Sequence, residues 1–487
     1  ANMLPKTSRP KYLVIFPLLY LWLCIQECSG VSKFPLLFVV SLDGFRYDYL
    51  QRNITPYMSH LANTGAYIQK LTPQFPSKTM PNHYTLATGL LPEYHGVVNN
   101  VYFDTKANKI VNTDDAIMYS YNSSAVPIWE LNERSHVDRH SGSVMWPGTQ
   151  HSYKNKALTY LIPFNMSATW NDTTSEVLRW FTDPVKPANL VMMYYKEPDL
   201  TAHQYGPNSV EITQTLKYLD NMIENLITSI KHAGLQDKLT VLILTDHGAT
   251  DTDEVRTVTL NVTKLNFDGS IQIVNNNPII NFYTPEENKT DALIEELEKS
   301  QDRDKFYIYK RGSIPVGYKL NHNHRIGDVI IEAKFGFQFS LNEGKPMKGL
   351  HGYNNSEIDM FGFAIGIGHT FNRVDIEEIN NLDIHPIMCY ILNLRCKKGI
   401  NHLQKILANP SHEDRHSHFF TVISILIFNF IIFFILMKLA YYIRKQRIIS
   451  RSLAFSSRNE IQFRVEEEPS HNEEISETSR LVTNEKD

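Results

Sequence analysis

The sequence predicts an α/β sandwich in which helices cover both faces of a mostly parallel central sheet. Four short, mostly apolar runs suit strands that are buried on both faces, at 36–42, 190–194, 240–244 and 361–365. Longer stretches of helical character lie between them, such as 209–233 and 290–299. Alternation of strands with helices is typical of an α/β fold, in which ligands bind beyond the carboxyl ends of the strands.

The composition excludes several classes of protein. Of 487 residues, 42% are hydrophobic and 21% are charged, so most of the chain is expected to fold around a core. Lys and Arg number 48 against 52 Asp and Glu, which argues against a nucleic-acid partner held by phosphate neutralisation. Only 4 Cys but 19 His are present, so any metal chemistry is expected to use His and carboxylate ligands.

Residues 1–30 have the pattern of a secretory signal peptide. Lys6, Arg9 and Lys11 precede an apolar run at 12–24, and small residues follow it. The run is short for a membrane span, and an uncleaved signal anchor is the alternative interpretation. We therefore expect an exported domain at 31–409.

A second apolar run, at 419–437, predicts a transmembrane helix. It carries no charge, and its 19 residues would span roughly 28 Å, close to the thickness of a bilayer core. A basic cluster that marks the cytoplasmic side follows at Lys438, Arg444, Lys445, Arg447 and Arg451. We expect a type I protein of the plasma membrane, with a juxtamembrane linker at 410–418 and a disordered, distally acidic cytoplasmic tail at 438–487.

Export predicts two covalent modifications. Seven Asn-X-Ser/Thr sequons lie between the two apolar runs, at Asn53, Asn122, Asn165, Asn171, Asn261, Asn288 and Asn354. Cys389 and Cys396 are expected to form a disulfide. Within one continuous helix they would be about 10 Å apart, beyond disulfide reach, so a helix is expected to end near Leu392.

Candidate metal ligands stand at four sites, three of which follow a predicted strand. They are Asp43, Asp199, His203, Asp246, His247 and His351. One Asp after a strand is usually a helix cap, so the prediction depends on the whole set. Three carboxylates and three imidazoles suit zinc, and six ligands fit two ions with open positions. Such a centre carries a charge of about +1, which would attract a phosphodiester.

The nucleophile is expected in the segment 75–84. Ser77 and Thr79 both carry a hydroxyl that a metal could activate by lowering its pKa. On chemistry alone, the choice between the two stays open.

Eight ordered motifs resemble those of the ectonucleotide pyrophosphatase/phosphodiesterase family, which belongs to the alkaline phosphatase superfamily. They are Leu42-Asp43-Gly44-Phe45-Arg46, Phe75-Pro76 through Pro81-Asn82-His83-Tyr84, Thr88-Gly89-Leu90, Glu93-Tyr94-His95-Gly96, Trp146-Pro147-Gly148, Glu197-Pro198-Asp199 with His203, Asp246-His247-Gly248 and His351-Gly352-Tyr353. The resemblance covers residues 35–405 and implies an alkaline-phosphatase-like α/β/α sandwich. It places the chain with short type I members, since the apolar run follows within about 15 residues of its end.

The resemblance also implies roles for individual residues. One Zn²⁺ would be held by Asp199, His203 and His351, and a second by Asp43, Asp246, His247 and the Thr79 oxygen. Thr79 would be the nucleophile that forms a phospho-threonine, and Asn100 would donate to a phosphate oxygen. Three residues match the family's substrate pocket: Met80, Phe164 and Tyr194. Met80 stands where an aromatic residue is usual and Phe164 where a Tyr is usual, so the match leaves the substrate preference open.

The leading expectation is a zinc-dependent ectoenzyme that hydrolyses phosphodiester or pyrophosphate bonds of extracellular nucleotides. The alternatives are a phospholipase-C-like hydrolase of choline phosphodiesters, a phosphomonoesterase, and a weakly active surface protein that serves adhesion or signalling. No oligomeric state is predicted.

Overall fold

The computed structural model describes residues 30–151, 157–265, 269–341, 346–396, 403–408 and 412–465. The chain divides into two units, 1–409 and 410–487, which are described separately. The predicted signal peptide lies outside the described residues, apart from Gly30.

An eight-stranded sheet forms the centre of the first unit. Its strands are, in spatial order, β18 (Val374–Asn380), β2 (Ala66–Thr72), β17 (Gly362–Ile367), β8 (Leu239–Leu244), β1 (Leu36–Leu42), β7 (Leu190–Tyr195), β5 (Ser141–Val144) and β6 (Tyr160–Ile162). Five of the seven pairings are parallel. The two antiparallel ones both involve β17. The predicted mostly parallel sheet is therefore confirmed, and the run at 361–365 supplies its reversed strand.

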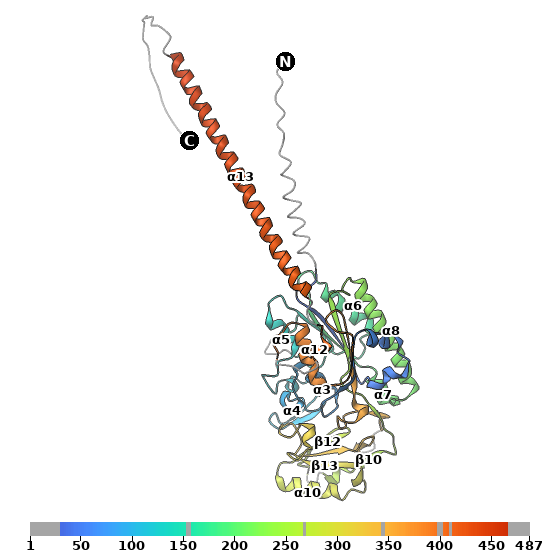
Figure 1. Cartoon of the computed structure of the whole chain (residues 1–487). Coiled ribbons are helices and arrows are strands. Elements are labelled where there is room, and N and C mark those ends of the chain that lie inside the picture. Colours follow the sequence, from blue (N-terminus) through green and yellow to red (C-terminus); the bar gives the residue numbers. More distant parts are fainter. Residues whose placement is uncertain are drawn as a thin grey trace, which may run out of the picture. The chain divides into compact units, whose positions relative to one another are not determined.

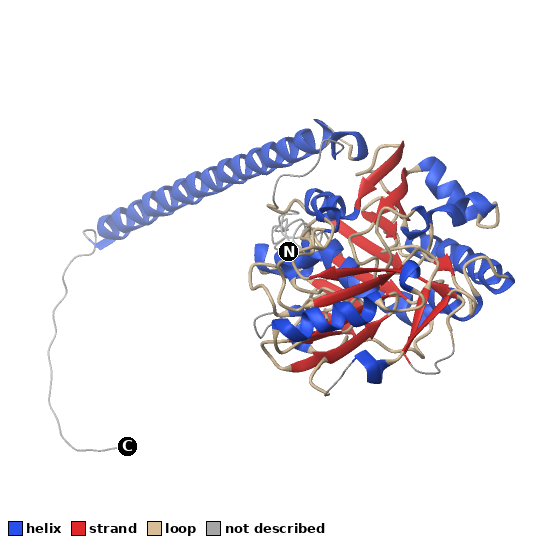
Figure 2. Ribbon diagram, turned by 90° about the horizontal axis from the view of Figure 1, so that it is seen from below, coloured by secondary structure: helices blue, strands red, loops and turns tan. Residues whose placement is uncertain are grey.

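Helices cover both faces of this sheet (Figure 1, Figure 2). One group consists of α2 (Pro56–Thr64), α6 (Trp170–Phe181), α7 (Asp199–Tyr205) and α8 (Val210–His232). The other consists of α3 (Thr79–Thr88), α4 (Pro92–His95), α5 (Ile128–Ser135) and α11 (Ile384–Ile391). In α8, Ser209 caps the first turn, and apolar side chains three or four positions apart form one buried stripe. These two layers confirm the α/β/α sandwich.

A smaller antiparallel sheet, absent from the sequence prediction, lies beyond one end of the central sheet (Figure 1). It is formed by β11 (Gln272–Asn276), β12 (Ile279–Tyr283), β14 (Val329–Ala333) and β13 (Phe306–Lys310). With α10 (Glu287–Glu298) it encloses an apolar cluster of its own. The buried Arg325 guanidinium attaches this region to the rest, because it donates to Gly96 O, to Ile117 O and to the Asp104 carboxylate.

The remaining described elements are short. They are β3 (Tyr102–Asp104), β4 (Lys109–Val111), β9 (Thr250–Asp251), β10 (Thr257–Leu260), α9 (Val262–Leu265), β15 (Gln338–Leu341), β16 (Gly349–Leu350), α12 (Leu403–Ile406) and the 3-10 turns Tyr47–Arg52, Ala116–Tyr119, Arg303–Lys305, Val316–Tyr318, Ile358–Met360 and Asn381–Asp383. Of these, β16 pairs with β9, which brings His351, directly after β16, close to the segment that follows β8.

The predicted disulfide is present. Cys389 and Cys396 are bonded, with their Cα atoms 6.1 Å apart. Helix α11 ends at Ile391, one residue before the predicted end, and Asn393 then takes a left-handed conformation that turns the chain back.

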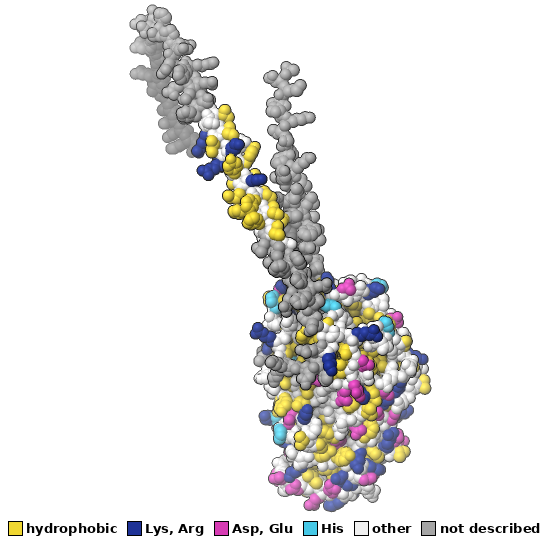
Figure 3. Space-filling model, viewed as in Figure 1, with side chains coloured by type: hydrophobic (Ala, Val, Ile, Leu, Met, Phe, Trp, Pro, Cys, Tyr) yellow, Lys and Arg dark blue, Asp and Glu magenta, His cyan; other side chains and the backbone are white. Residues whose placement is uncertain are grey.

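The second unit contains one long helix, α13 (His412–Val465). Its stretch Ile427–Leu453 has a mean hydropathy of 1.7 and is long and apolar enough to cross a membrane. Figure 3 shows apolar side chains exposed along this stretch, with Lys and Arg toward its carboxyl end. The stretch overlaps the predicted span 419–437. The expectation of a disordered tail from 438 is wrong for 438–465, which continue the helix, while 466–487 lie outside the described residues.

Candidate active site

The carboxyl ends of three central strands bring the predicted ligands together. Asp43 follows β1 directly, and Asp246 and His247 follow its neighbour β8. On the other side of β1, β7 leads into α7, which begins at Asp199. Backbone bonds hold these segments in register, since Asp199 N donates to Asp43 O (3.0 Å) and Gly44 N donates to an Asp246 carboxylate oxygen (3.2 Å). Parallel strands therefore deliver their terminal side chains to one place.

Short distances join all six predicted ligands. His247 Nε2 lies 3.0 Å from Asp246 Oδ2 and 3.4 Å from Asp43 Oδ1. On the other side, Asp199 carboxylate oxygens lie 3.2 Å from His203 Nε2 and 3.6 Å from His351 Nε2. The His247 and His351 rings stack with centroids 3.7 Å apart and connect the two halves. Asp43, Asp246 and His247 form one group able to hold a metal ion, and Asp199, His247 and His351 form another.

Each ligand imidazole is oriented by a backbone carbonyl. The Nδ1 atoms of His203, His247 and His351 lie 2.8 to 2.9 Å from Gly349 O, Gly248 O and Ser77 O, respectively. A carbonyl can only accept, so the ring proton lies on Nδ1 and Nε2 faces the carboxylates. This is the arrangement that fixes metal-ligating histidines in proteins.

The carboxylates are crowded and incompletely satisfied. Among the described residues, Asp43 Oδ1, Asp199 Oδ1 and Asp246 Oδ2 are buried without a hydrogen-bond partner. Burial raises the pKa of Asp43 well above its usual range, and the neighbouring carboxylates add to this effect. Burial acts in the same direction on Asp199 and Asp246, but the adjacent imidazoles outweigh it and lower the pKa of both. Buried oxygens of this kind are the donor set that a divalent cation requires.

The surroundings shift the pKa values of two of the imidazoles in opposite directions. Burial, followed by the nearby His247, lowers the pKa of His351 well below its usual range. At His203, burial acts in the same direction, but the Asp199 carboxylate outweighs it and raises the pKa.

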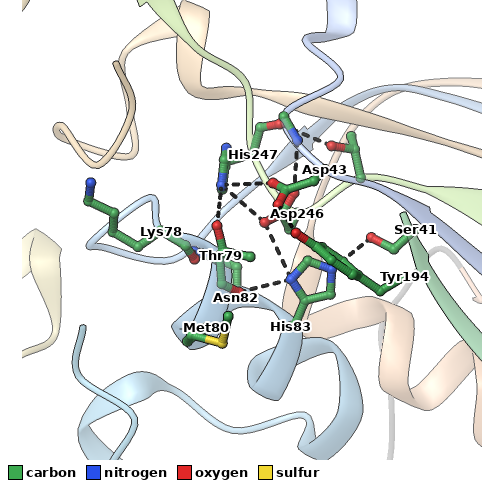
Figure 4. Close-up of polar contacts among 12 residues, drawn as sticks. Ser41, Asp43, Lys78, Thr79, Met80, Asn82, His83, Tyr194, Asp246 and His247 are labelled. Atoms are coloured by element: carbon green, nitrogen blue, oxygen red, sulfur yellow. Dashed lines mark hydrogen bonds and ion pairs between the residues drawn. The ribbon is translucent and has the colours of Figure 1, made fainter. Parts of the chain in front are cut away.

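The structure distinguishes the two hydroxyls that the sequence left open. Thr79 is the first residue of α3, and its Oγ1 lies 3.3 Å from His247 Nε2 (Figure 4). The Ser77 hydroxyl is fully buried and donates to Tyr353 O (2.9 Å). Only Thr79 therefore presents its oxygen to the ligand group.

A cavity of about 380 Å³ borders the Asp199 half of the site, and Lys78, Asn100, His203 and His351 are among its lining residues. Burial lowers the pKa of Lys78 to about 7, although Asp199 acts in the opposite direction. The Lys78 ammonium donates to Asn277 O. Asn100 Oδ1 accepts from Met80 N (2.9 Å), which leaves the carboxamide nitrogen as the end that can donate to a bound group.

The three predicted pocket residues differ in exposure. Phe164 is 47% exposed, and its ring centroid is 6.3 Å from that of Tyr194. Met80 is partly buried, and the Tyr119 hydroxyl donates to its sulfur (3.4 Å). Tyr194 is buried, and its hydroxyl donates to Asp43 Oδ2 (2.5 Å). Tyr194 thus supports a candidate ligand, and only its ring is left to border a pocket.

Two residues near the site had no role in the sequence analysis. His83 Nδ1 lies 3.3 Å from Asp246 Oδ2. Arg46, from the first motif, donates to Ala249 O (3.0 Å), two residues after His247. His83 stands four positions after Thr79, a spacing that places both side chains on one face of a helix. That spacing was the available signal for His83, and nothing comparable marked Arg46.

Fold and site together define a phosphate-transferring hydrolase of the alkaline phosphatase type. Residues 37–354 match the family described as type I phosphodiesterase / nucleotide pyrophosphatase. The chain belongs to this ectonucleotide pyrophosphatase/phosphodiesterase family and is an enzyme of its class.

Two human relatives and two solved structures illustrate the similarity. The chain is 32% identical over 360 residues to human ectonucleotide pyrophosphatase/phosphodiesterase family member 5, covering 73% of this chain and 74% of that one. It is 31% identical over 388 residues to human bis(5'-adenosyl)-triphosphatase ENPP4, covering 79% and 84%. The human family member 5 structure superposes with a TM-score of 0.71 at 30% identity, covering 77% of this chain and all of that one. An inactive murine counterpart was solved in complex with AMP and gives 0.70 with the same identity and coverage.

Proposed function

We propose that this chain is a zinc-dependent ectoenzyme that hydrolyses phosphodiester and pyrophosphate bonds of extracellular nucleotides through a phospho-threonine intermediate. The observation that carries the proposal is the Thr79 hydroxyl beside a connected set of Asp and His side chains with unsatisfied buried oxygens. AMP in the murine relative and the diadenosine substrate in the name of human ENPP4 support a nucleotide as the substrate.

The donor set fits two zinc ions. In this proposal Asp199, His203 and His351 hold one, while Asp43, Asp246 and His247 hold the other together with Thr79 Oγ1. When bound, zinc supplies Lewis-acid stabilisation of phosphate charge and lowers the pKa of a ligated hydroxyl. Two Zn²⁺ and three carboxylates give a net charge of about +1, which complements a singly charged phosphodiester.

The protein's own residues then perform the reaction. Thr79 Oγ1 forms a bond to phosphorus as the bond from phosphorus to the leaving oxygen breaks, and water later cleaves the phospho-threonine. The Asn100 carboxamide nitrogen donates to a phosphate oxygen, because its oxygen is already engaged by Met80 N. The exposed Phe164 ring offers a stacking surface for the base, with Met80 as a less directional neighbour.

Substrate comparison with the full-length chain on cell membranes tests this function. Nitrophenyl esters of a nucleotide, of phosphate and of phosphocholine are assayed in parallel with zinc supplied. We expect cleavage of the nucleotide diester, and Thr79→Ala should lower kcat by about 10³-fold or more. Ser77→Ala is the matched control and should retain most activity, since the Ser77 hydroxyl donates to the backbone Tyr353 O and not to a proposed ligand among the described residues. Cleavage of phosphocholine alone would replace the nucleotide proposal with the choline alternative.

We further propose that the catalytic domain is extracellular, that α13 anchors it in the plasma membrane and that the sequons carry glycans. Five sequon side chains are exposed, and those of Asn122 and Asn354 are half-buried. Antibody access to the domain on intact cells, combined with a mobility shift after glycosidase treatment, tests this topology. Labelling that requires permeabilised cells would contradict it.

A further inference from the structure

A fully buried histidine lies within 3.3 Å of one proposed metal ligand, Asp246. His83 lies on α3 one turn after Thr79 and has none of its surface exposed. We propose that His83 is a positioning residue: its ring fixes the Asp246 carboxylate and the start of α3, and so keeps a metal ligand and the nucleophile in register. The inference rests on the proposed function, because Asp246 and Thr79 carry roles assigned there.

The contacts of the ring define which nitrogen holds the proton. His83 Nδ1 lies 2.9 Å from Thr79 O and 3.3 Å from Asp246 Oδ2 (Figure 4). Both atoms can only accept, so Nδ1 carries a hydrogen that points between them. His83 Nε2 lies 2.9 Å from Ser41 Oγ, whose hydroxyl can donate to it. One ring thus connects the nucleophile's own backbone with a candidate ligand carboxylate.

These contacts join three separate segments of the fold. Ser41 lies on β1 two residues before Asp43, Asp246 follows β8, and Thr79 begins α3. The three approach one another only in the folded chain, and His83 is bonded to or within 3.3 Å of each. A displacement of its ring would therefore shift the nucleophile and a ligand together.

The ring is itself held rigidly. Trp146 and Tyr194 pack edge-on against it, with ring centroids 5.0 and 5.1 Å away and interplanar angles near 80°. Tyr194 in turn donates to Asp43, so the packing around His83 reaches the second carboxylate of the same group. Side chains that orient metal ligands from outside typically affect metal affinity or activity by about 10- to 100-fold.

A second buried histidine of the same region provides the matched control. His95 is also fully buried, and burial lowers its pKa to about 3. Its Nε2 lies 3.0 Å from Thr85 Oγ1, and its Nδ1 accepts from Val97 N (3.1 Å). None of these partners is a proposed ligand or the nucleophile, so His95 is a buried histidine of the same region with no bond to either among the described residues.

Three substitutions at His83 separate its two contacts. In His83→Asn, the side-chain nitrogen can replace the Nδ1 donor. In His83→Gln, the longer side chain reaches toward Ser41 instead, and His83→Leu fills the space but retains neither hydrogen-bonding group. Zinc bound per chain is measured in the full-length protein over a series of buffered zinc concentrations. In addition, kcat and KM are measured for a nitrophenyl nucleotide diester, and Tm is recorded with and without chelator.

We expect His83→Gln and His83→Leu to weaken zinc binding and lower kcat by about 10- to 100-fold, with KM little changed. His83→Asn should stay within about fivefold of the unmodified chain, and so should Ser41→Ala, which is available if the His83 variants do not fold. His95→Leu should lower Tm but leave zinc binding and kcat of the folded protein unchanged.

Two outcomes would overturn the inference. If His83→Gln binds zinc and turns over like the unmodified chain, the ring does not position the site. If His83 and His95 variants lose zinc only in proportion to the drop in Tm, His83 has a purely structural role. An unmodified chain that neither binds zinc nor cleaves the diester would instead refute the proposed function, and the inference with it.

Discussion

Two regions of this protein bury carboxylates, and they compensate for the burial in different ways. At the end of the central sheet, Asp43, Asp199 and Asp246 each keep one buried oxygen that has no hydrogen-bond partner in the part of the chain that the structure describes. In the small sheet, the buried Glu332 accepts from the Tyr318 hydroxyl (2.9 and 3.2 Å) and the Tyr309 hydroxyl (3.4 Å). Burial raises the pKa of Glu332 to about 7, against the effect of both tyrosines.

The difference indicates that the two groups of buried carboxylates are stabilised in different ways. A single buried carboxylate can be stabilised by hydroxyl donors and by taking up a proton. Three carboxylates in contact with three imidazoles present their oxygens to one space instead, which suits cations. We therefore interpret the buried acidic group of the small sheet as structural and, under the proposed function, those at the strand ends as metal ligands.

The largest contrast is expected from the same chemical change made in both regions. Asp246→Asn removes a charge from the proposed ligand set and should lower kcat by about 10³-fold or more. Glu332→Gln should leave kcat within about threefold, because it removes no ligand. Steady-state kinetics on both variants measure this, and equal losses would remove the distinction between the regions.

Removal of metal should lower the free energy of unfolding by the amount that metal binding at the strand-end site contributes. Binding to the folded state alone contributes about 4 kcal/mol per site at a thousandfold excess of metal over Kd. A chelator should therefore lower Tm by roughly 10 °C in a domain of this size. Differential scanning calorimetry of the unmodified chain and Asp246→Asn checks it, since the variant should respond much less.

The small sheet should produce a pH-dependent effect with a defined sign. The pKa of Glu332 rises from 4.5 to about 7 on folding, so the folded state keeps a proton that the unfolded state has lost in this window. The free energy of unfolding should fall by at most about 3 kcal/mol as pH rises from 4.5 to 7. Above pH 7, Glu332 should cause no further change. Urea unfolding at pH 4.5 and 8 should show this loss in the unmodified chain but not in Glu332→Gln. Tyr318→Phe should enlarge it, because the charged form loses a donor.

The smallest effect is expected at the open side of the site. Met80→Phe places an aromatic side chain directly after Thr79, and stacking on a base contributes about 1 kcal/mol. KM for a nucleotide diester should therefore fall about fivefold, with kcat and both metal groups unchanged. An unaltered KM would place the base elsewhere, and the same variant assayed with nitrophenyl phosphate serves as the control.

Much of the fold and of the ligand set was predictable from the sequence because it depends on short-range patterns. Continuous apolar runs marked β1, β7 and β8 to within a residue or so, and the polar residues that follow them marked all the candidate ligands except His351. The disulfide was expected because an exported domain favours pairing of Cys389 with Cys396, and helix geometry over seven positions then required the helix to end between them. The reversed direction of β17 and the small antiparallel sheet were not predictable, because strand direction depends on distant partners.

Residue types and their spacing supplied the candidate side chains for catalysis, but only the folded chain shows which of them lie together. Ser77 and Thr79 are chemically equivalent candidates, but the start of α3 turns only Thr79 toward His247. Tyr194 resembled a pocket residue, yet its hydroxyl is bonded to Asp43, and His83 had no assigned role until Asp246 and Ser41 were found around it. The physical reason is that hydrogen bonds form over about 3 Å between groups far apart in sequence, and only folding brings such groups within that distance.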